Sequence, residues 1–379
     1  MNTPVVIAAY ARSPFHFAEK GALRKVRPDT LAATVVKALV ARSGVDPDAI
    51  EDLILGCAFP EGEQGLNLAR LVVLLAGLPQ SVAGVTMNRF CGSSMQAIHT
   101  AAGAIQMGAG EAFICAGVES MSRVPMMGFN PLPHPDLAAA VPGAYMTMGE
   151  TAENLARKYQ IPRAEQEAFA VESQAKAAAA RAEGRLADEI VPIEAGGETI
   201  DQDGCIRPDT SAEGLSGLKP AFFADGTVTA GTSSPLTDGA AAALVTTEAF
   251  AKASGLPILA RIRAVAVAGC DPTIMGIGPV AASRKALARA GVAVGDLDII
   301  ESNEAFAVQA MAVERKMGFN RERTNLDGGA IALGHPLGAT GARITGKAAA
   351  LLKREGKELA LATQCIGGGQ GIATVLEAA

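Results

Sequence analysis

The sequence predicts an α/β protein built from two similar halves, with a long insertion in the first half. Two observations support this prediction. Short aliphatic strand patterns alternate with amphipathic helix patterns through residues 1–120, and the alternation resumes at Asp238. Parts of the first alternation also recur at an offset of about 246 residues, which indicates an internal duplication. Aliphatic strands separated by helices are typical of a mostly parallel sheet that helices cover on both faces.

Composition narrows the class of protein. A chain of 379 residues is long enough for two or three domains, and its apolar stretches are too short and too often interrupted for a membrane span. The net charge of −6, without a basic block interleaved with aromatic residues, argues against nucleic-acid binding. Residues 1–10 resemble a strand rather than a signal peptide, so we expect a cytoplasmic protein.

The cysteines give no sign of a metal site. They stand at positions 57, 91, 115, 205, 270 and 365, without CxxC spacing. This pattern argues against zinc and redox motifs, so no metal and no permanently bound cofactor are expected. Free thiols fit a reducing compartment.

The first part of the chain contains four strand patterns and three helix patterns. The strands are predicted at residues 5–9, 53–57, 82–87 and 112–116, and the helices at residues 30–43, 67–75 and 93–107. Gly44 follows the first helix as its stop signal.

The next segment has a different character. Residues 121–149 are rich in Met, Pro and Gly, two helices are predicted at 151–159 and 163–183, and turn residues dominate 192–237. We therefore expect residues 121–236 to be an insertion. Its basic residues Arg207 and Lys219 could meet a phosphate, although composition alone favours ordinary solvated surface residues.

The duplication sets the domain boundaries. The Lys-Ala-Leu at 37–39 and the Gly-Val at 44–45 recur at 285–287 and 291–292, each copy leading to a strand. The sequence predicts an N-terminal half from residues 1–120 and 237–257, a loop domain from 121–236, and a C-terminal half from 258–379.

Cys91 lies where a predicted strand turns into a helix. The unpaired N–H groups and the positive dipole end of that helix favour a thiolate. Gly92 lets the backbone approach a reacting carbonyl, and Ser93 and Ser94 could cap the helix. Alone, this stretch fits a small buried hydrophobic residue more often than a nucleophile.

The duplication pairs Cys91 with His335. The offset leads from Cys91 to the glycine-rich turn at 334–341, which precedes a predicted helix at 342–352. If the halves pack around a pseudo-twofold axis, both helix N-termini converge on one site. His335 could take the Cys91 proton and then hydrogen-bond an oxyanion. The remaining histidines are expected to be structural or solvated: His16, His99 and His134.

Two further motifs follow predicted strands of the second half. A triple glycine at 367–369, next to Cys365, follows the strand at 359–362 and suits an oxyanion hole, a phosphate loop or a tight turn. It has neither the Walker A nor the dinucleotide spacing. Asn303 follows the strand at 297–301 and could hold a water or polarise a carbonyl, while Glu304 could orient His335 or cap the next helix.

Taken together, the segments at 88–93, 303–306, 334–338 and 365–369 resemble the thiolase family in residues, order and spacing. The resemblance extends to the segments at 149–154, 206–210 and 229–234, so it covers essentially the whole chain. It implies a thiolase-like fold, with two duplicated α/β halves in five α-β-α-β-α layers and a loop domain over the coenzyme A site.

The resemblance also implies residue roles. Cys91 resembles the nucleophile that becomes acylated, and His335 resembles its activating histidine. Cys365 resembles the acid/base that protonates the acetyl-CoA enolate and later deprotonates CoA. Asn303 resembles the residue that holds an oxyanion-hole water, and the N–H groups of Cys91 and Gly367 resemble a second hole. Arg207 and Ser234 match positions that line the CoA site.

The implied activity is thiolytic cleavage of a 3-oxoacyl-CoA by CoA, as in fatty-acid β-oxidation, with CoA as a substrate. Alternatives are condensation of acetyl-CoA to acetoacetyl-CoA, a decarboxylating condensing enzyme, and a non-catalytic lipid-binding or scaffold protein. Acetoacetyl-CoA-type members carry a histidine just before the Met-Gly-x-Thr-Ala-Glu segment, where this chain has none, which leaves the acyl-chain length open. Family members are dimers or tetramers, so a homodimer or homotetramer is expected, and a β-oxidation partner subunit is compatible with the sequence.

Overall fold

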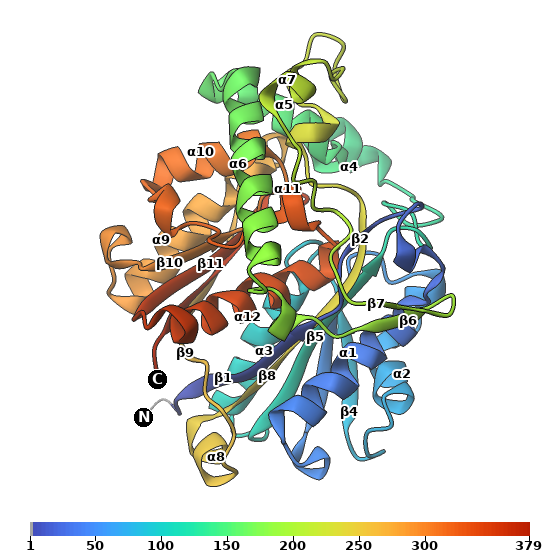
Figure 1. Ribbon diagram of the computed structural model, residues 1–379, viewed down its shortest axis with the longest axis vertical. Helices are drawn as coiled ribbons and strands as arrows, with labels where there is room; N and C mark the ends of the chain where they lie inside the picture. The colour runs from blue at the N-terminus through green and yellow to red at the C-terminus, as the bar shows by residue number, and fades with distance from the viewer. Residues whose placement is uncertain (1–2) are drawn as a thin grey trace.

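The computed structural model describes residues 3–379 (Figure 1). The strands are β1 (Val5–Arg12), β2 (His16–Phe17), β3 (Asp52–Gly56), β4 (Ala83–Met87), β5 (Ala112–Ser120), β6 (Ile193–Ala195), β7 (Glu198–Ile200), β8 (Thr237–Thr247), β9 (Ala260–Gly269), β10 (Ile299–Ser302), β11 (Leu359–Ile366) and β12 (Gln370–Glu377). The α-helices are α1 (Pro28–Ser43), α2 (Leu68–Leu75), α3 (Ser93–Gln106), α4 (Pro135–Ala140), α5 (Met148–Tyr159), α6 (Arg163–Ala182), α7 (Ala212–Ser216), α8 (Glu248–Ala253), α9 (Gly278–Ala290), α10 (Ala307–Met317), α11 (Ala330–Leu333) and α12 (Leu337–Glu355).

One long sheet joins the two halves of the chain. Its strand order is β10-β11-β12-β9-β1-β8-β5-β3-β4, and β2 pairs with β8. The halves meet where β1 pairs with β9, through Val6 opposite Arg261 and Ile7 opposite Ala260. This seam is short, so packing of helices between the half-sheets supplies most of the contact between them.

The expectation of a mostly parallel sheet is wrong. Parallel pairing is found for β3 with β4 and β5, and for β10 with β11. The strands β8 and β12 run antiparallel to their neighbours, because the chain returns from the insertion into β8 and turns tightly from β11 into β12. Both strands are almost wholly buried, so no alternation of polar and apolar residues marks them in the sequence.

The layers agree with the predicted α-β-α-β-α architecture (Figure 1). Helix α1 packs on β1, β5 and β8 from one outer side, and α9 packs on β9, β11 and β12 from the other. Helices α3 and α12 lie between the half-sheets, and α12 contacts strands of both. The apolar core is accordingly divided among the outer interfaces and the central layer.

The duplication is visible in the order of elements. The series β1, α1, β3, α3, β5 and β8 corresponds to β9, α9, β10, α12, β11 and β12. In the second half, the place of β4 is reduced to a single parallel bridge between Ile300 and Thr324. The central helices α3 and α12 are therefore equivalent elements of the two copies.

Several boundaries differ from the predictions in ways that affect the site. Helix α12 begins at Leu337 rather than at residue 342, so His335 lies two residues before it. Strand β11 continues to Ile366, so Cys365 belongs to the strand and not to the loop after it. No helix among residues 3–379 combines the length and the apolar character needed to cross a lipid bilayer.

Candidate active site

A strained loop presents Cys91 just ahead of α3. Phe90 has a φ of 44°, in the left-handed region that non-glycine residues seldom occupy. The side chain of Asn88 accepts a hydrogen bond from Phe90 N at 2.7 Å, and Ser93 Oγ accepts one from Arg89 N at 2.9 Å. These bonds hold the turn that places Cys91 immediately before Gly92, the N-cap of α3.

The prediction that Ser93 and Ser94 cap α3 is wrong. The N-cap residue Gly92 makes no side-chain capping bond, and Ser93 Oγ donates to Phe90 O at 2.6 Å. Ser94 Oγ instead accepts a hydrogen bond from Ala342 N in α12 at 2.8 Å. Ser94 therefore joins the two central helices.

The starts of α3 and α12 meet, as the duplication suggested. At Gly341 an added Cβ would collide with the backbone of Met95, so glycine is needed for the helices to approach this closely. The carbonyl of Gly338 similarly occupies the space beside Gly117 of β5. Through this contact the residues just before each helix reach the same region of the fold.

Cys91 lies between the start of α12 and the end of β11. Its side chain packs in a small apolar cluster with Leu337, and the side-chain amide of Gln364 donates to its carbonyl oxygen. Burial raises the pKa of the Cys91 thiol to about 12, and a hydrogen bond from the Gly367 N–H acts in the opposite direction. Desolvation therefore works against the thiolate that the helix N-terminus was expected to favour.

His335 is held so that one ring nitrogen is available as a base. Its backbone N–H donates to Thr237 Oγ1 at 3.0 Å, and its Nδ1 lies 2.7 Å from Thr340 Oγ1. The Thr340 hydroxyl donates to Pro336 O at 3.2 Å, so it accepts from Nδ1–H and leaves Nε2 unprotonated. Burial lowers the pKa of His335 to about 3, so the ring is neutral.

Asn303 stands beside His335 at the end of β10. Its Nδ2 lies 3.4 Å from His335 Nε2, and its backbone N–H donates to Thr363 O at 2.9 Å. Asn303 Oδ1 is buried and has no hydrogen-bond partner within residues 3–379. An amide and an imidazole in this arrangement can bind a polar group between them, either a carbonyl oxygen or a water.

Cys365 and Gly367 complete the group of predicted site residues. Cys365 is 1% exposed, and burial raises the pKa of its thiol well above the ordinary value, with the neighbouring Cys91 acting in the same direction. At Gly367 the atoms nearest to an added Cβ would be Met148 Sδ at 3.4 Å and Phe90 Cδ2 at 3.6 Å. The Gly367 N–H hydrogen-bonds the Cys91 thiol, and the side chains of Met148 and Phe90 lie beside Gly367.

The two residues predicted to line a CoA site are placed differently. Ser234 is next to the Asn303 segment, because both its N–H and its Oγ donate to Ala305 O, at 2.9 and 3.0 Å. Arg207 lies on the insertion, where its N–H donates to Gln174 Oε1 at 2.8 Å and its guanidinium lies 5.9 Å from the centre of the Phe17 ring. Within residues 3–379, no hydrogen bond or ion pair links Arg207 to Cys91 or Cys365.

Glu119 is a buried acid that sequence reasoning missed. Its carboxylate accepts from Ala58 N at 2.8 Å and from Gln64 Nε2 at 2.8 Å, and from Gly338 N in the first turn of α12 at 2.9 Å. It thereby ties the loop after β3 to the start of α12. Its position at the end of β5 was the signal available in the sequence, since carboxyl ends of strands collect functional residues.

Comparisons with known proteins show the family of the chain. The family model of the thiolase N-terminal domain matches residues 5–249, and that of the thiolase C-terminal domain matches residues 256–378. The 3-ketoacyl-CoA thiolase of Pseudoalteromonas translucida (strain TAC 125) is 50% identical over 100% of this chain and 99% of its own. The 3-ketoacyl-CoA thiolase of Bacillus subtilis (strain 168) is 48% identical over 98% of both chains.

Solved structures show the same likeness. Human mitochondrial 3-ketoacyl-CoA thiolase in complex with CoA has a TM-score of 0.92 and 39% identity, covering 100% of this chain and 98% of its own. The acetyl-CoA acetyltransferase of Bacillus anthracis also has a TM-score of 0.92, with 42% identity over 100% of both chains. The fold is thus that of the solved thiolase structures.

Proposed function

Because this chain belongs to the thiolase family, we propose that it cleaves 3-oxoacyl-CoA with CoA, giving acetyl-CoA and an acyl-CoA shortened by one acetyl unit. The observation that carries the proposal is the gathering of two thiols, a neutral imidazole and the backbone N–H of Gly367 where α3, α12 and β11 meet. CoA is a substrate in this reaction. The activity is that of the 3-ketoacyl-CoA thiolases to which the chain is similar.

The first half-reaction forms an acyl-enzyme. His335 Nε2 takes the proton of Cys91, and the thiolate attacks C3 of the substrate. The N–H groups of Cys91 and Gly367 hold the resulting oxyanion. The C2–C3 bond then breaks, its electron pair forms the enolate of acetyl-CoA, and the Cys365 thiol donates a proton to C2. Asn303 and His335 hold the enolate oxygen, Asn303 through a water.

The second half-reaction releases the acyl group. The Cys365 thiolate takes the proton of an incoming CoA thiol, and the CoA sulfur attacks the thioester on Cys91. The Cys91 thiolate leaves and recovers its proton from His335. Burial raises the pKa of both cysteines, so each thiol keeps its proton in the resting protein, and a Cys365 thiolate, once formed, is a strong base toward the CoA thiol.

The insertion is proposed to cover the CoA molecule. In this proposal Ser234 lies at the inner end of the CoA site, beside the Asn303 segment, and Arg207 meets a more distant part of the cofactor. This proposal keeps the predicted domain boundaries at residues 120/121, 236/237 and 257/258, which define the loop domain. Calorimetric titration of CoA into the protein and into an Arg207→Ala variant tests the Arg207 contact, which predicts weaker binding by the variant.

We also propose that the protein is a homodimer or homotetramer in the cytoplasm. The strand β4 forms one end of the long sheet and exposes Val85, which suits strand pairing between copies. Six free cysteines fit a reducing compartment. Native mass spectrometry, with and without a candidate β-oxidation subunit, measures the assembly.

A second candidate function is condensation of two acetyl-CoA molecules to acetoacetyl-CoA. The similarity to the acetyl-CoA acetyltransferase of Bacillus anthracis favours it. A chain-length series of 3-oxoacyl-CoA substrates separates the candidates. We expect kcat/KM to be higher for longer 3-oxoacyl chains than for acetoacetyl-CoA, whereas activity restricted to acetoacetyl-CoA would support the condensing enzyme. Absence of thiolysis at every chain length would contradict both.

A further inference from the structure

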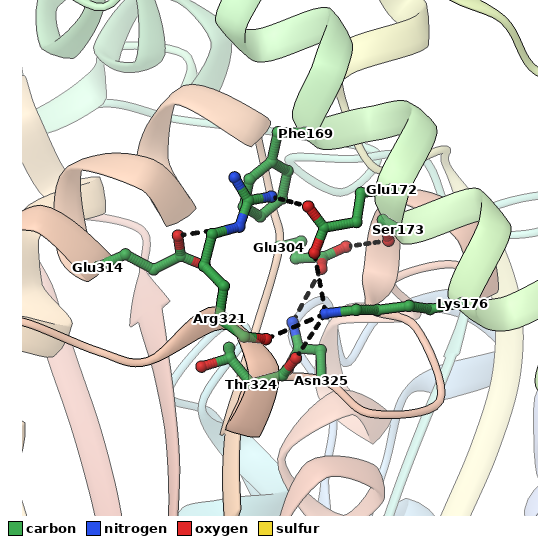
Figure 2. A pocket seen from close by; sticks show the side chains of 9 residues that line it. All are labelled: Phe169, Glu172, Ser173, Lys176, Glu304, Glu314, Arg321, Thr324 and Asn325. Carbon is green, nitrogen blue, oxygen red and sulfur yellow. Dashed lines mark hydrogen bonds and ion pairs between the residues drawn. The ribbon is translucent and has the colours of Figure 1, made fainter. Parts of the chain in front are cut away.

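Glu304, the residue after Asn303, lies in a buried cluster between α6, the loop before α11 and the 3₁₀ turn Arg321–Arg323 (Figure 2). Its side chain is 2% exposed. The carboxylate accepts hydrogen bonds from Ser173 Oγ at 2.6 Å, Asn325 Nδ2 at 2.8 Å and Ile331 N at 3.2 Å. It does not cap α10, so the capping role predicted from the sequence is wrong, and it makes no direct hydrogen bond to His335.

The hydrogen-bond partners favour an ionised carboxylate and act against burial, which raises the pKa of Glu304. Ile331 offers a backbone N–H and Asn325 an amide N–H, neither of which can accept a proton. The Ser173 hydroxyl already accepts from Gly329 N at 3.2 Å, so its proton points to Glu304. The surrounding donors therefore fit an acceptor-only group in this position.

One branch of the cluster leads to Asn303. Asn325 adopts a left-handed conformation with a φ of 48°. Its side chain accepts from Ser302 N at 3.0 Å and donates to Ser302 O at 2.9 Å, while also donating to Glu304. Asn325 thus holds both backbone groups of Ser302, the residue before Asn303, and Glu304 holds the Asn325 amide in place.

A second branch leads to His335. Ile331 belongs to α11, a single helical turn that ends at Gly334 with a φ of 108°. The residue that follows this turn is His335. By accepting the Ile331 N–H, Glu304 ties the start of that turn to the segment that carries Asn303.

A third branch leads into the insertion. Ser173 and its neighbour Gln174 both lie on α6. Gln174 accepts from Arg207 N at 2.8 Å and donates to Ile331 O at 3.2 Å. Helix α6 thereby links the proposed CoA segment to the turn before His335.

The outer side of the cluster shows that it is not a ligand site. Lys176 donates to the carbonyls of Arg321 and Thr324, both at 3.1 Å, and Glu172 pairs with Arg321 at 2.7 Å (Figure 2). The space enclosed is about 10 Å³. This is room for about one water molecule and for no substrate.

We propose that Glu304 is a positioning residue. It holds Asn303 and His335 in the relative positions that stabilise the enolate. This inference rests on the proposed function, because the enolate arises only in cleavage of the C2–C3 bond. Acyl transfer between Cys91 and CoA forms no enolate. It uses His335 for proton transfer and the N–H groups of Cys91 and Gly367 for its oxyanion, and it does not use Asn303. Loss of Glu304 therefore slows carbon–carbon cleavage more than it slows acyl transfer.

The test compares these two reactions in the full-length protein. Glu304→Gln keeps the shape but turns an N–H2 group toward donors. We expect its kcat for thiolysis of acetoacetyl-CoA to fall on the order of tenfold to a hundredfold, with little change in KM. Exchange of the acetyl group between acetyl-CoA and labelled CoA should fall much less. Glu314→Gln is the matched control, since Glu314 lines the same cluster and contacts Arg321.

The outcomes separate this inference from the proposed function. If the wild-type protein does not cleave 3-oxoacyl-CoA, the proposed function fails. If it does, and Glu304→Gln either matches wild type or loses both reactions equally while still folded, the positioning role is wrong. Should Glu304→Gln not fold, Ser173→Ala removes a single donor, and the same ratio of the two rates decides the question.

Discussion

Helices α3 and α12 occupy equivalent places in the two copies of the fold, yet the residues before them differ in chemistry. Ahead of α3, the left-handed Phe90 sets the position of a thiol, Cys91. Ahead of α12, the left-handed Gly334 sets the position of an imidazole, His335. Duplication thus supplied two similar helix starts. They form one site because a different reactive group lies before each helix.

The same comparison holds for the electrostatics of the two starts. Burial raises the pKa of Cys91 and lowers that of His335, so both groups are neutral in the resting protein. Burial therefore disfavours both products of a proton transfer between them, the Cys91 thiolate and the His335 imidazolium. The N-terminus of α12 meanwhile binds the buried carboxylate of Glu119, whereas Gly92 at the N-terminus of α3 has no side-chain cap.

The largest expected effect comes from removing the base. Each central helix has a buried histidine: His335 lies before α12, and His99 lies within α3, where Nε2 is 2.8 Å from Thr374 Oγ1. We expect His335→Gln to lower kcat by roughly 10²–10⁴-fold, because the proton of Cys91 then has no acceptor. His99→Gln should keep kcat close to wild type. Steady-state kinetics at pH 7.5 measures kcat for both variants. Equal losses of kcat would contradict the assignment of His335, rather than His99, as the base.

A smaller effect is expected from the contact between the helices. Gly341→Ala would push α12 away from the backbone of Met95, which costs about 1–3 kcal/mol of stability when a well-packed interior is overfilled. Gly103→Ala in α3 is the matched control, because an added Cβ there meets nothing within 4 Å. That change should stabilise the helix by about 0.5–1 kcal/mol. Urea unfolding measures the free energy of unfolding of both variants. A Gly341→Ala variant as stable as wild type would contradict the close approach of α3 and α12.

The smallest expected effect is on the pH dependence of stability. Burial lowers the pKa of His99 to about 3, against about 6.5 in the unfolded chain. Below pH 6.5 the unfolded chain therefore binds a proton that the folded protein refuses, and stability falls by about 1 kcal/mol per pH unit from this group as the pH drops toward 3. Glu301 and Glu314, whose pKa values burial raises to about 7, act in the opposite direction.

The measurement is therefore the difference between wild type and His99→Gln. Urea midpoints at pH 7.5, 6.5 and 5.5 should show wild type losing stability relative to the variant only below about pH 6.5. A difference that stays constant across this range would mean that His99 takes up its proton in the folded protein as readily as in the unfolded chain.

Much of the fold could be predicted because short sequence segments reveal both the duplication and the helix starts. The five-layer architecture and the thiolase resemblance are confirmed by the structure and the comparisons. The pairing of Cys91 with His335 followed from the repeat offset alone, and the structure brings the two segments together. The roles assigned to individual site residues stay predictions that the experiments above test.

The features that escaped prediction depend on contacts between distant segments. Ser173 and Glu304 are 131 positions apart, and no local pattern marks either as a partner of the other. The strand β8 is buried along its whole length and includes four successive alanines at 240–243, so it lacks the alternation that reveals a strand. The pKa of Cys91 was misjudged because the helix dipole is visible in the sequence, whereas the burial that opposes it is not.

The most direct test of the central claim is to locate the acyl group. The protein is mixed with acetyl-CoA, quenched in acid and digested, and the cysteine-containing peptides are analysed by mass spectrometry. We predict an acetyl group on the Cys91 peptide in wild type and in the buried-cysteine control Cys115→Ala, and none in Cys91→Ala, which should also lack thiolysis. An acetyl group on the Cys365 peptide, or thiolysis by Cys91→Ala, would contradict the account.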